Sequence, residues 1–268
     1  MIMPLSDDNS DRQRFPYVNY ILIGINILVF VVFQGMGSNA KFTYAWSTVP
    51  AEIVSGQDIV TQDRVVQAGR ERVRVPGLQE TPFSVYLTLL TSMFMHGGIA
   101  HIAGNMLFLW IFGDNIEDVL GHVRYLLYYL LCGLIASLAH VFLTVVLHGA
   151  DSKAAMIPSL GASGAISGVM GGYLLLFPQR RVMVLMLRMV THVPAWVAVG
   201  MWFVFQLIEG IGMLGGKETG VAYAAHIGGF LAGMVLVVPF QAGIDRSTWE
   251  HRRDLQRDSW EHRRREPW

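Results

Sequence analysis

The sequence predicts an all-α, polytopic membrane protein: a bundle of six transmembrane helices with a long first loop. Of the 268 residues, 53% are hydrophobic and only 15% are charged, whereas soluble globular chains carry about 25% charged residues. The basic residues are also absent from several long apolar runs. The length of these runs is close to the roughly 20 residues that cross the hydrocarbon core of a bilayer. A soluble protein of buried helices is the alternative, but most of these runs lack the polar face that its helices would show.

The six-span domain is expected to occupy residues 17–243, after a cytoplasmic N-terminal segment of residues 1–16. This first segment is polar and of mixed charge, whereas a cleavable signal peptide begins with a basic stretch followed by an apolar one. The spans are expected at residues 17–33, 98–113, 123–147, 163–177, 193–213 and 221–240, and an apolar continuation of the second run reaches Val119.

The first loop, residues 35–97, divides into two parts. Its middle, Glu52–Glu80, is polar, and its end, Pro82–Met95, is apolar but too short to cross a membrane before Gly97 and Gly98 interrupt it. The amphipathic character of this end predicts a helix that lies in or on the membrane interface.

The charges of the loops predict the orientation. Six spans place both termini on one side, where a short loop contains Arg180 and Arg181, whereas the opposite short loops contain only Lys153 and Lys217. Positively charged loops stay in the cytoplasm. We therefore expect an integral multi-pass protein of the bacterial inner membrane with both termini in the cytoplasm.

Polar residues inside a span are costly and usually functional, and Ser163 is the first candidate. It opens a run of only about 15 residues, or roughly 22 Å of helix, against a hydrocarbon core of about 30 Å. Ser163 should therefore begin a short helix below the membrane surface. The non-helical backbone before it survives at that depth only where it lines a water-filled cavity, and hydrolysis needs such a cavity.

His226 is the natural base for Ser163, because a serine hydroxyl becomes a nucleophile when a base takes its proton. Stripes of small residues on the fourth and sixth runs predict the close helix packing that would bring the two together. No carboxylate is near either residue in sequence, so a Ser–His dyad is expected rather than a triad. The stripes are Gly164, Gly168 and Gly172, and Ala225, Gly229 and Gly233.

His101 and Asn105 are four residues apart, and therefore lie on one face of the second helix. Their imidazole and amide N–H groups can stabilise the oxyanion of a tetrahedral intermediate. Backbone N–H groups at the start of the fourth helix can add to them, helped by the helix dipole.

With these motifs in place, the chain resembles the rhomboid family of intramembrane serine proteases from Phe15 to Phe240. The matching motifs are HIAGN at 101–105, GASG at 161–164 and AHIGG at 225–229, in that order, and the segment 112–121 resembles the family's turn after the second helix.

The resemblance implies a six-helix rhomboid bundle in which Ser163 is the nucleophile, His226 the base, and His101 with Asn105 the oxyanion site. It implies that the substrates are single-span membrane proteins cut within or beside the lipid bilayer, without a metal or other cofactor. A formal net charge of zero argues against nucleic acid as a partner.

Two features depart from the family pattern. Ser167 stands where many members carry an aromatic residue under the histidine, and Trp46 has no adjacent arginine to complete the family's Trp–Arg pair. Two other functions stay open: an inactive relative that binds transmembrane segments, and a transporter, which would show internal repeats. For His96 we expect a structural hydrogen bond that holds the loop.

A charged C-terminal tail, residues 244–268, contains an eleven-residue repeat. Eleven residues are close to three helical turns, so Trp249 and Trp260 would share one face of a helix. The tail holds none of the candidate catalytic groups.

Overall fold

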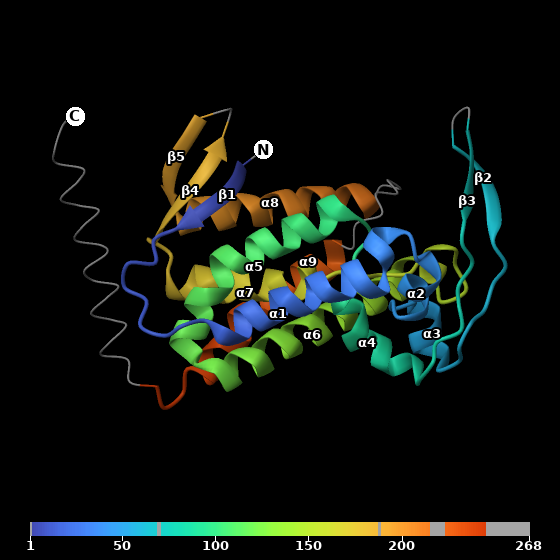
Figure 1. Cartoon of the computed structure of the whole chain (residues 1–268), viewed down its shortest axis with the longest axis horizontal. Coiled ribbons are helices and arrows are strands. Elements are labelled where there is room, and N and C mark those ends of the chain that lie inside the picture. Colours follow the sequence, from blue (N-terminus) through green and yellow to red (C-terminus); the bar gives the residue numbers. More distant parts are fainter. Residues whose placement is uncertain (1, 69–70, 187–188, 215–222, 245–268) are drawn as a thin grey trace.

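The computed structural model describes residues 2–68, 71–186, 189–214 and 223–244, most of which are helical. Figure 1 shows the long helices side by side as a bundle, with a small sheet near one end and short helices with a β-hairpin at the other. The bundle helices are α1 (Tyr17–Leu28), α5 (Ile99–Leu120), α6 (His122–His148), α7 (Ser163–Leu176), α8 (Ala195–Leu214) and α9 (Tyr223–Phe240).

Each bundle helix falls on one of the expected apolar runs. Within the described residues, α6 and α9 are long and apolar enough to cross a membrane, and a third span results if α5 is joined to the helical segment Val85–Phe94 before it. Three shorter apolar helices cover Tyr17–Phe33, Ser163–Leu176 and Ala195–Gly210. The count of six spans stays a prediction.

The first loop contains short elements that cover one end of the bundle (Figure 1). Its apolar end forms the helical segment Val85–Phe94, bent by 79° from α5. The expected position of this helix at the membrane interface stays a prediction. The elements are α2 (Ala40–Ala45), α3 (Pro50–Ser55), the hairpin strands β2 (Arg64–Ala68) and β3 (Glu71–Val75), and α4 (Thr88–Thr91) between two short 3₁₀ turns.

The expectation of an all-α fold is wrong in one respect, because the described residues include five strands. Besides the hairpin, β1 (Ile2–Asp7) pairs antiparallel with β4 (Arg181–Met186), and β4 pairs with β5 (Met189–Pro194). The polar N-terminal segment is therefore partly an edge strand. The fifth helix begins at Ala195, after β5 rather than at the expected Val193.

Polar side chains connect the N-terminal segment to the bundle beside this sheet. Arg12 pairs with Asp114 at 2.7 Å, and Arg180 pairs with Asp11 at 2.7 Å. Glu117 accepts the backbone N–H groups of Val18 and Asn19 at the start of α1, where a carboxylate is favoured by the helix dipole. The segment that resembles the family's turn is helical up to Leu120.

Asp7 is half-buried in this cluster and should make stability depend on pH. Its carboxylate accepts hydrogen bonds from Tyr173 (2.6 Å) and Asn115 (2.8 Å), while burial and then the nearby Asp114 raise the pKa of Asp7 from 3.8 to about 7. Between these values the folded state holds a proton that the unfolded chain has lost, so the Asp7 contribution to stability falls as pH rises.

We therefore expect the free energy of unfolding to decline from about pH 4 to about pH 7, and Asp7→Asn to lose the part of that slope that Asp7 contributes. Burial also raises the pKa of Glu52, from 4.5 to about 7, so a slope of the same sign should remain in the variant. Equilibrium unfolding in detergent across this range measures it. Equal slopes in the two proteins would contradict the assignment to Asp7.

The two glycine stripes pack against each other as the sequence predicts. A Cβ atom at Gly229 would overlap the carbonyl oxygen of Gly164, and one at Gly233 would overlap that of Gly168. The Tyr128 hydroxyl of α6 lies 2.7 Å from the Gly168 carbonyl and 3.0 Å from the Gly233 carbonyl. Glycine is thus required where α7 and α9 touch backbone to backbone, and this contact fixes the start of α7 against the start of α9.

Gly233→Ala should lower the free energy of unfolding by about 2 kcal/mol or more, because the added methyl meets backbone rather than a side chain that can move. Gly200→Ala is the matched control, since a Cβ there meets none of the described residues within 4 Å, and its effect should stay below about 0.5 kcal/mol. Comparable losses in both variants would show that the close contact is not what matters.

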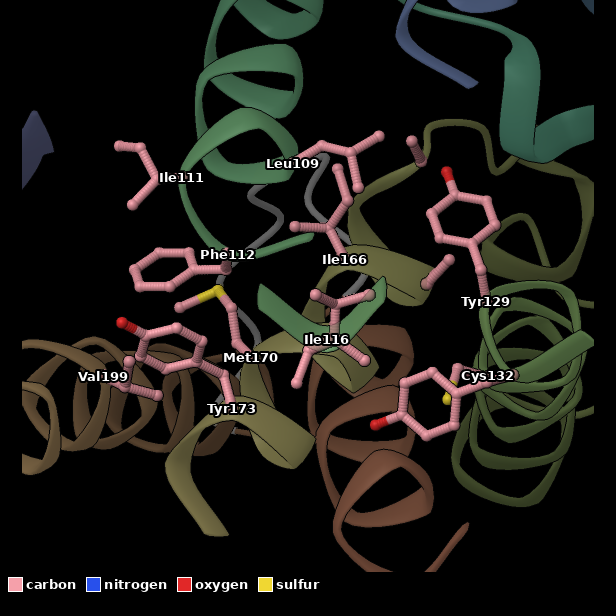
Figure 2. Close-up of a cluster of buried hydrophobic side chains, with 14 of the residues drawn as sticks. Leu109, Ile111, Phe112, Ile116, Tyr129, Cys132, Ile166, Met170, Tyr173 and Val199 are labelled. Carbon is pink, nitrogen blue, oxygen red and sulfur yellow. The ribbon is translucent and has the colours of Figure 1, made fainter. Parts of the chain in front are cut away.

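The centre of the bundle is built from large apolar side chains where α5 meets α7. Figure 2 shows Leu109, Phe112 and Ile116 of α5 together with Ile166, Met170 and Tyr173 of α7. This packing holds α5 beside α7. It thereby brings the α5 face that carries His101 and Asn105 close to the chain that leads into α7.

Candidate active site

Ser163 and His226 are in direct contact. Ser163 is the first residue of α7, His226 lies in the first turn of α9, and the Ser163 Oγ is 2.7 Å from the His226 Nε2. The close packing of α7 on α9 produces this distance. A histidine at hydrogen-bonding distance from a serine can take the hydroxyl proton as a nucleophile forms.

The other ring nitrogen of His226 is also bonded. Its Nδ1 is 2.6 Å from the Oε1 of Gln206 on α8. The Trp202 ring, one turn earlier on α8, lies 6.1 Å from the His226 ring, and the Tyr223 ring lies 6.2 Å from it. Ser167 instead donates a hydrogen bond to the Ser163 carbonyl at 2.6 Å. Support for the histidine therefore comes from α8 and α9.

His101 and Asn105 lie beside the backbone that leads to Ser163. Gly161 has a φ of +122°, and a Cβ there would be 2.8 Å from the His101 Nε2 and 3.6 Å from the Asn105 Nδ2. Glycine is the residue that fits both this backbone conformation and the approach of the two side chains.

Both side chains can donate a hydrogen bond at this place. Within the part of the chain that the structure describes, the Asn105 Nδ2 is buried without a hydrogen-bond partner. The His101 Nδ1 accepts the Gly97 backbone N–H at 3.3 Å, which leaves Nε2, the nitrogen nearer Gly161, to carry the ring proton. An unpartnered buried donor is costly, so the site suits an incoming acceptor such as an oxyanion.

The non-helical chain before Ser163 is held by the first loop. Ser159 exchanges backbone hydrogen bonds with Thr48 (2.7 and 3.0 Å), and the Gly161 N–H donates to the Ser92 carbonyl at 2.9 Å. A small cavity of about 20 Å³ lies here, lined in part by Ser92, Ser159 and Ser163. That volume holds about one water molecule.

His96 is fully buried beside His101, with ring centroids 5.2 Å apart. Its backbone is clamped by Gln34, which accepts the His96 N–H and donates to the His96 carbonyl. Among the residues that the structure describes, both ring nitrogens of His96 lack a hydrogen-bond partner. The loop is therefore held through the His96 backbone and not through its side chain.

The structure thus brings all four sequence candidates together, and their chemical roles stay predictions. Sequence reasoning missed Gln206, although a polar residue inside an apolar run was a usable signal. A partly buried Ser–His pair at the starts of two apolar helices defines the class: a helical membrane protein in which a serine and a histidine are in hydrogen-bonding contact.

The chain belongs to the rhomboid family: the family's rhomboid domain matches residues 84–242, more than half of the chain. With its apolar helices, this makes it an integral membrane protein. It is 35% identical over 143 residues to the Bacillus subtilis "Rhomboid protease GluP", covering 52% of this chain and 26% of the relative.

Mitochondrial proteins are also similar. The identity is 31% over 171 residues to the human "Presenilin-associated rhomboid-like protein, mitochondrial" (60% of this chain, 42% of the relative) and 27% over 219 residues to the yeast "Rhomboid protein 1, mitochondrial" (81% and 51%). The chain spans about half or less of the length of these relatives.

Proposed function

We propose that this chain is an intramembrane serine endopeptidase that hydrolyses peptide bonds within or beside the membrane segments of single-span proteins. The observation that carries the proposal is the 2.7 Å contact between the Ser163 Oγ and the His226 Nε2. Membership of a family that includes a protein named as a protease supports it.

The first step forms an acyl-enzyme. The Ser163 oxygen attacks the carbonyl carbon of the substrate peptide while its proton passes to the His226 Nε2. The carbonyl oxygen becomes an oxyanion that accepts hydrogen bonds from His101 and Asn105, with the positive end of the α7 dipole nearby. When the C–N bond breaks, His226 returns the proton to the leaving amine.

The second step consumes water. A water molecule gives a proton to His226 and its oxygen attacks the acyl carbon; the Ser163 oxygen then leaves and recovers the proton. This sequence needs no metal or other cofactor. A membrane helix hides its carbonyls in its own hydrogen bonds, so a substrate must present the scissile bond in extended form.

We propose six spans with both termini in the cytoplasm. The pairing of β1 with β4 supports this arrangement, because it requires the N-terminal segment and the loop between α7 and α8 to lie on one side of the membrane. The relatives include a bacterial protein and mitochondrial ones, so they do not favour the expected bacterial inner membrane over a mitochondrial one.

Labelling by a fluorophosphonate tests the function, since this probe reacts with a serine that a base has activated. We expect the full-length protein in detergent to be labelled, and Ser163→Ala to be unlabelled. Labelling that is equal in both proteins, or absent from a folded wild type, would favour a non-catalytic relative that binds transmembrane segments.

A further inference from the structure

We infer that Gln206 is the third member of the catalytic array, a positioning residue that holds the His226 ring ready to accept the proton of Ser163. The inference rests on the proposed function and extends it to α8. The Gln206 side chain supports the His226 ring in place of the aromatic residue that Ser167 replaces. The array then runs from Ser163 on α7 through His226 on α9 to Gln206 on α8.

The hydrogen-bond roles follow from the chemistry of the neutral imidazole. One ring nitrogen carries the proton and the other accepts, so a His226 whose Nε2 accepts from Ser163 must carry its own proton on Nδ1. The Gln206 Oε1, 2.6 Å away, is an acceptor for that N–H. Gln206 therefore selects the tautomer that can act as a base.

An amide fits this role in an apolar bundle. The third residue of such arrays orients the histidine and stabilises the imidazolium that forms as the serine loses its proton, and an asparagine serves on some other folds. A carboxylate could accept the same hydrogen bond, and the imidazolium that forms beside it would offset part of its desolvation. The Gln206 carbonyl supplies the acceptor without adding a charge.

The placement on α8 adds a second contact. Trp202 and Gln206 are four residues apart and so lie on one face of the helix, and both reach the same ring. Gln206 fixes the direction of the Nδ1–H, while the Trp202 ring lies tilted 37° to the imidazole. One helical face thus controls the orientation of the base.

The test uses Gln206→Met in the full-length protein, because methionine has nearly the same length, no strong acceptor, and an apolar character suited to the bundle. We expect fluorophosphonate labelling of Ser163, and kcat for a single-span substrate, to fall roughly ten- to a hundredfold, the effect of losing a hydrogen bond to a group that becomes charged. KM should change little, because Gln206 does not reach the substrate.

Gln206→Glu is the rescue variant, since it keeps an acceptor at the same place; its labelling rate should return to within about threefold of wild type, as in arrays with a carboxylate. Glu209→Leu, an exposed position on the same helix, is the matched control and should keep the wild-type rate. Thermal stability is measured for each variant.

Wild-type labelling in Gln206→Met would overturn the inference while leaving the proposed function intact. A folded Gln206→Glu as slow as Gln206→Met would overturn it too, because the acceptor would then not be what matters. If the wild type itself is not labelled, the proposed function fails first.

Discussion

Replacing Ser163 or His226 with alanine should abolish cleavage of a single-span substrate. The 2.7 Å contact makes the two residues one unit: without the serine no acyl-enzyme forms, and without the histidine the hydroxyl keeps its proton. Each single variant should lose at least roughly a thousandfold in kcat, and the double variant should be no worse than either, because residues that act together are strongly non-additive. Cleavage of a purified substrate in liposomes measures the loss.

Ser167→Ala is the matched control for this experiment. Ser167 lies one turn after Ser163 on the same helix and bonds its carbonyl rather than the histidine, so its loss should leave most of the activity. Near wild-type cleavage by Ser163→Ala would remove the basis for the proposed protease. A chelator should change nothing, since no step uses a metal.

Asn105→Ala should slow turnover by roughly ten- to a thousandfold, somewhat less than the loss of a full oxyanion-hole donor in a drier site. The buried, unpartnered Nδ2 beside Gly161 is the physical reason: it gains a partner when the oxyanion forms. His101 and the start of α7 also stabilise the oxyanion, so some activity should remain. The measurement is kcat at saturating substrate.

Asn115→Ala separates this effect from a loss of structure. Asn115 is on the same helix, but its amide bonds Asp7 and Asn9 in the polar cluster at the other end. Its loss should lower thermal stability while kcat per folded molecule stays near wild type. If Asn105→Ala lowers activity only as far as it lowers the folded fraction, Asn105 is structural.

The helices and the four candidate residues were predictable for related reasons. Long uncharged runs locate the helices, and a polar side chain such as Ser163 or His226 is conspicuous within them. The glycine stripes even predicted which two helices meet, because a backbone contact needs small residues at fixed spacing on both.

The strands and Gln206 were harder to predict. In β4 the buried Val182 and Val184 alternate with Met183 and Leu185, which are apolar as well, so the period of two that marks a strand is hidden. Gln206 belongs to no motif, and its importance comes from contact with a histidine on another helix. Such a contact requires the fold.

The strand pairing at the N-terminus has a consequence for how the protein is made. Ile2 and Asp7 pair with Met186 and Val182. β1 is therefore synthesised long before β4, the strand with which it pairs. Contacts between such distant parts of a chain form slowly. During that interval β1 exposes unpaired backbone groups that could pair with another chain. The β1–β4 pairing can therefore form only after α1, α5, α6 and α7 have been synthesised.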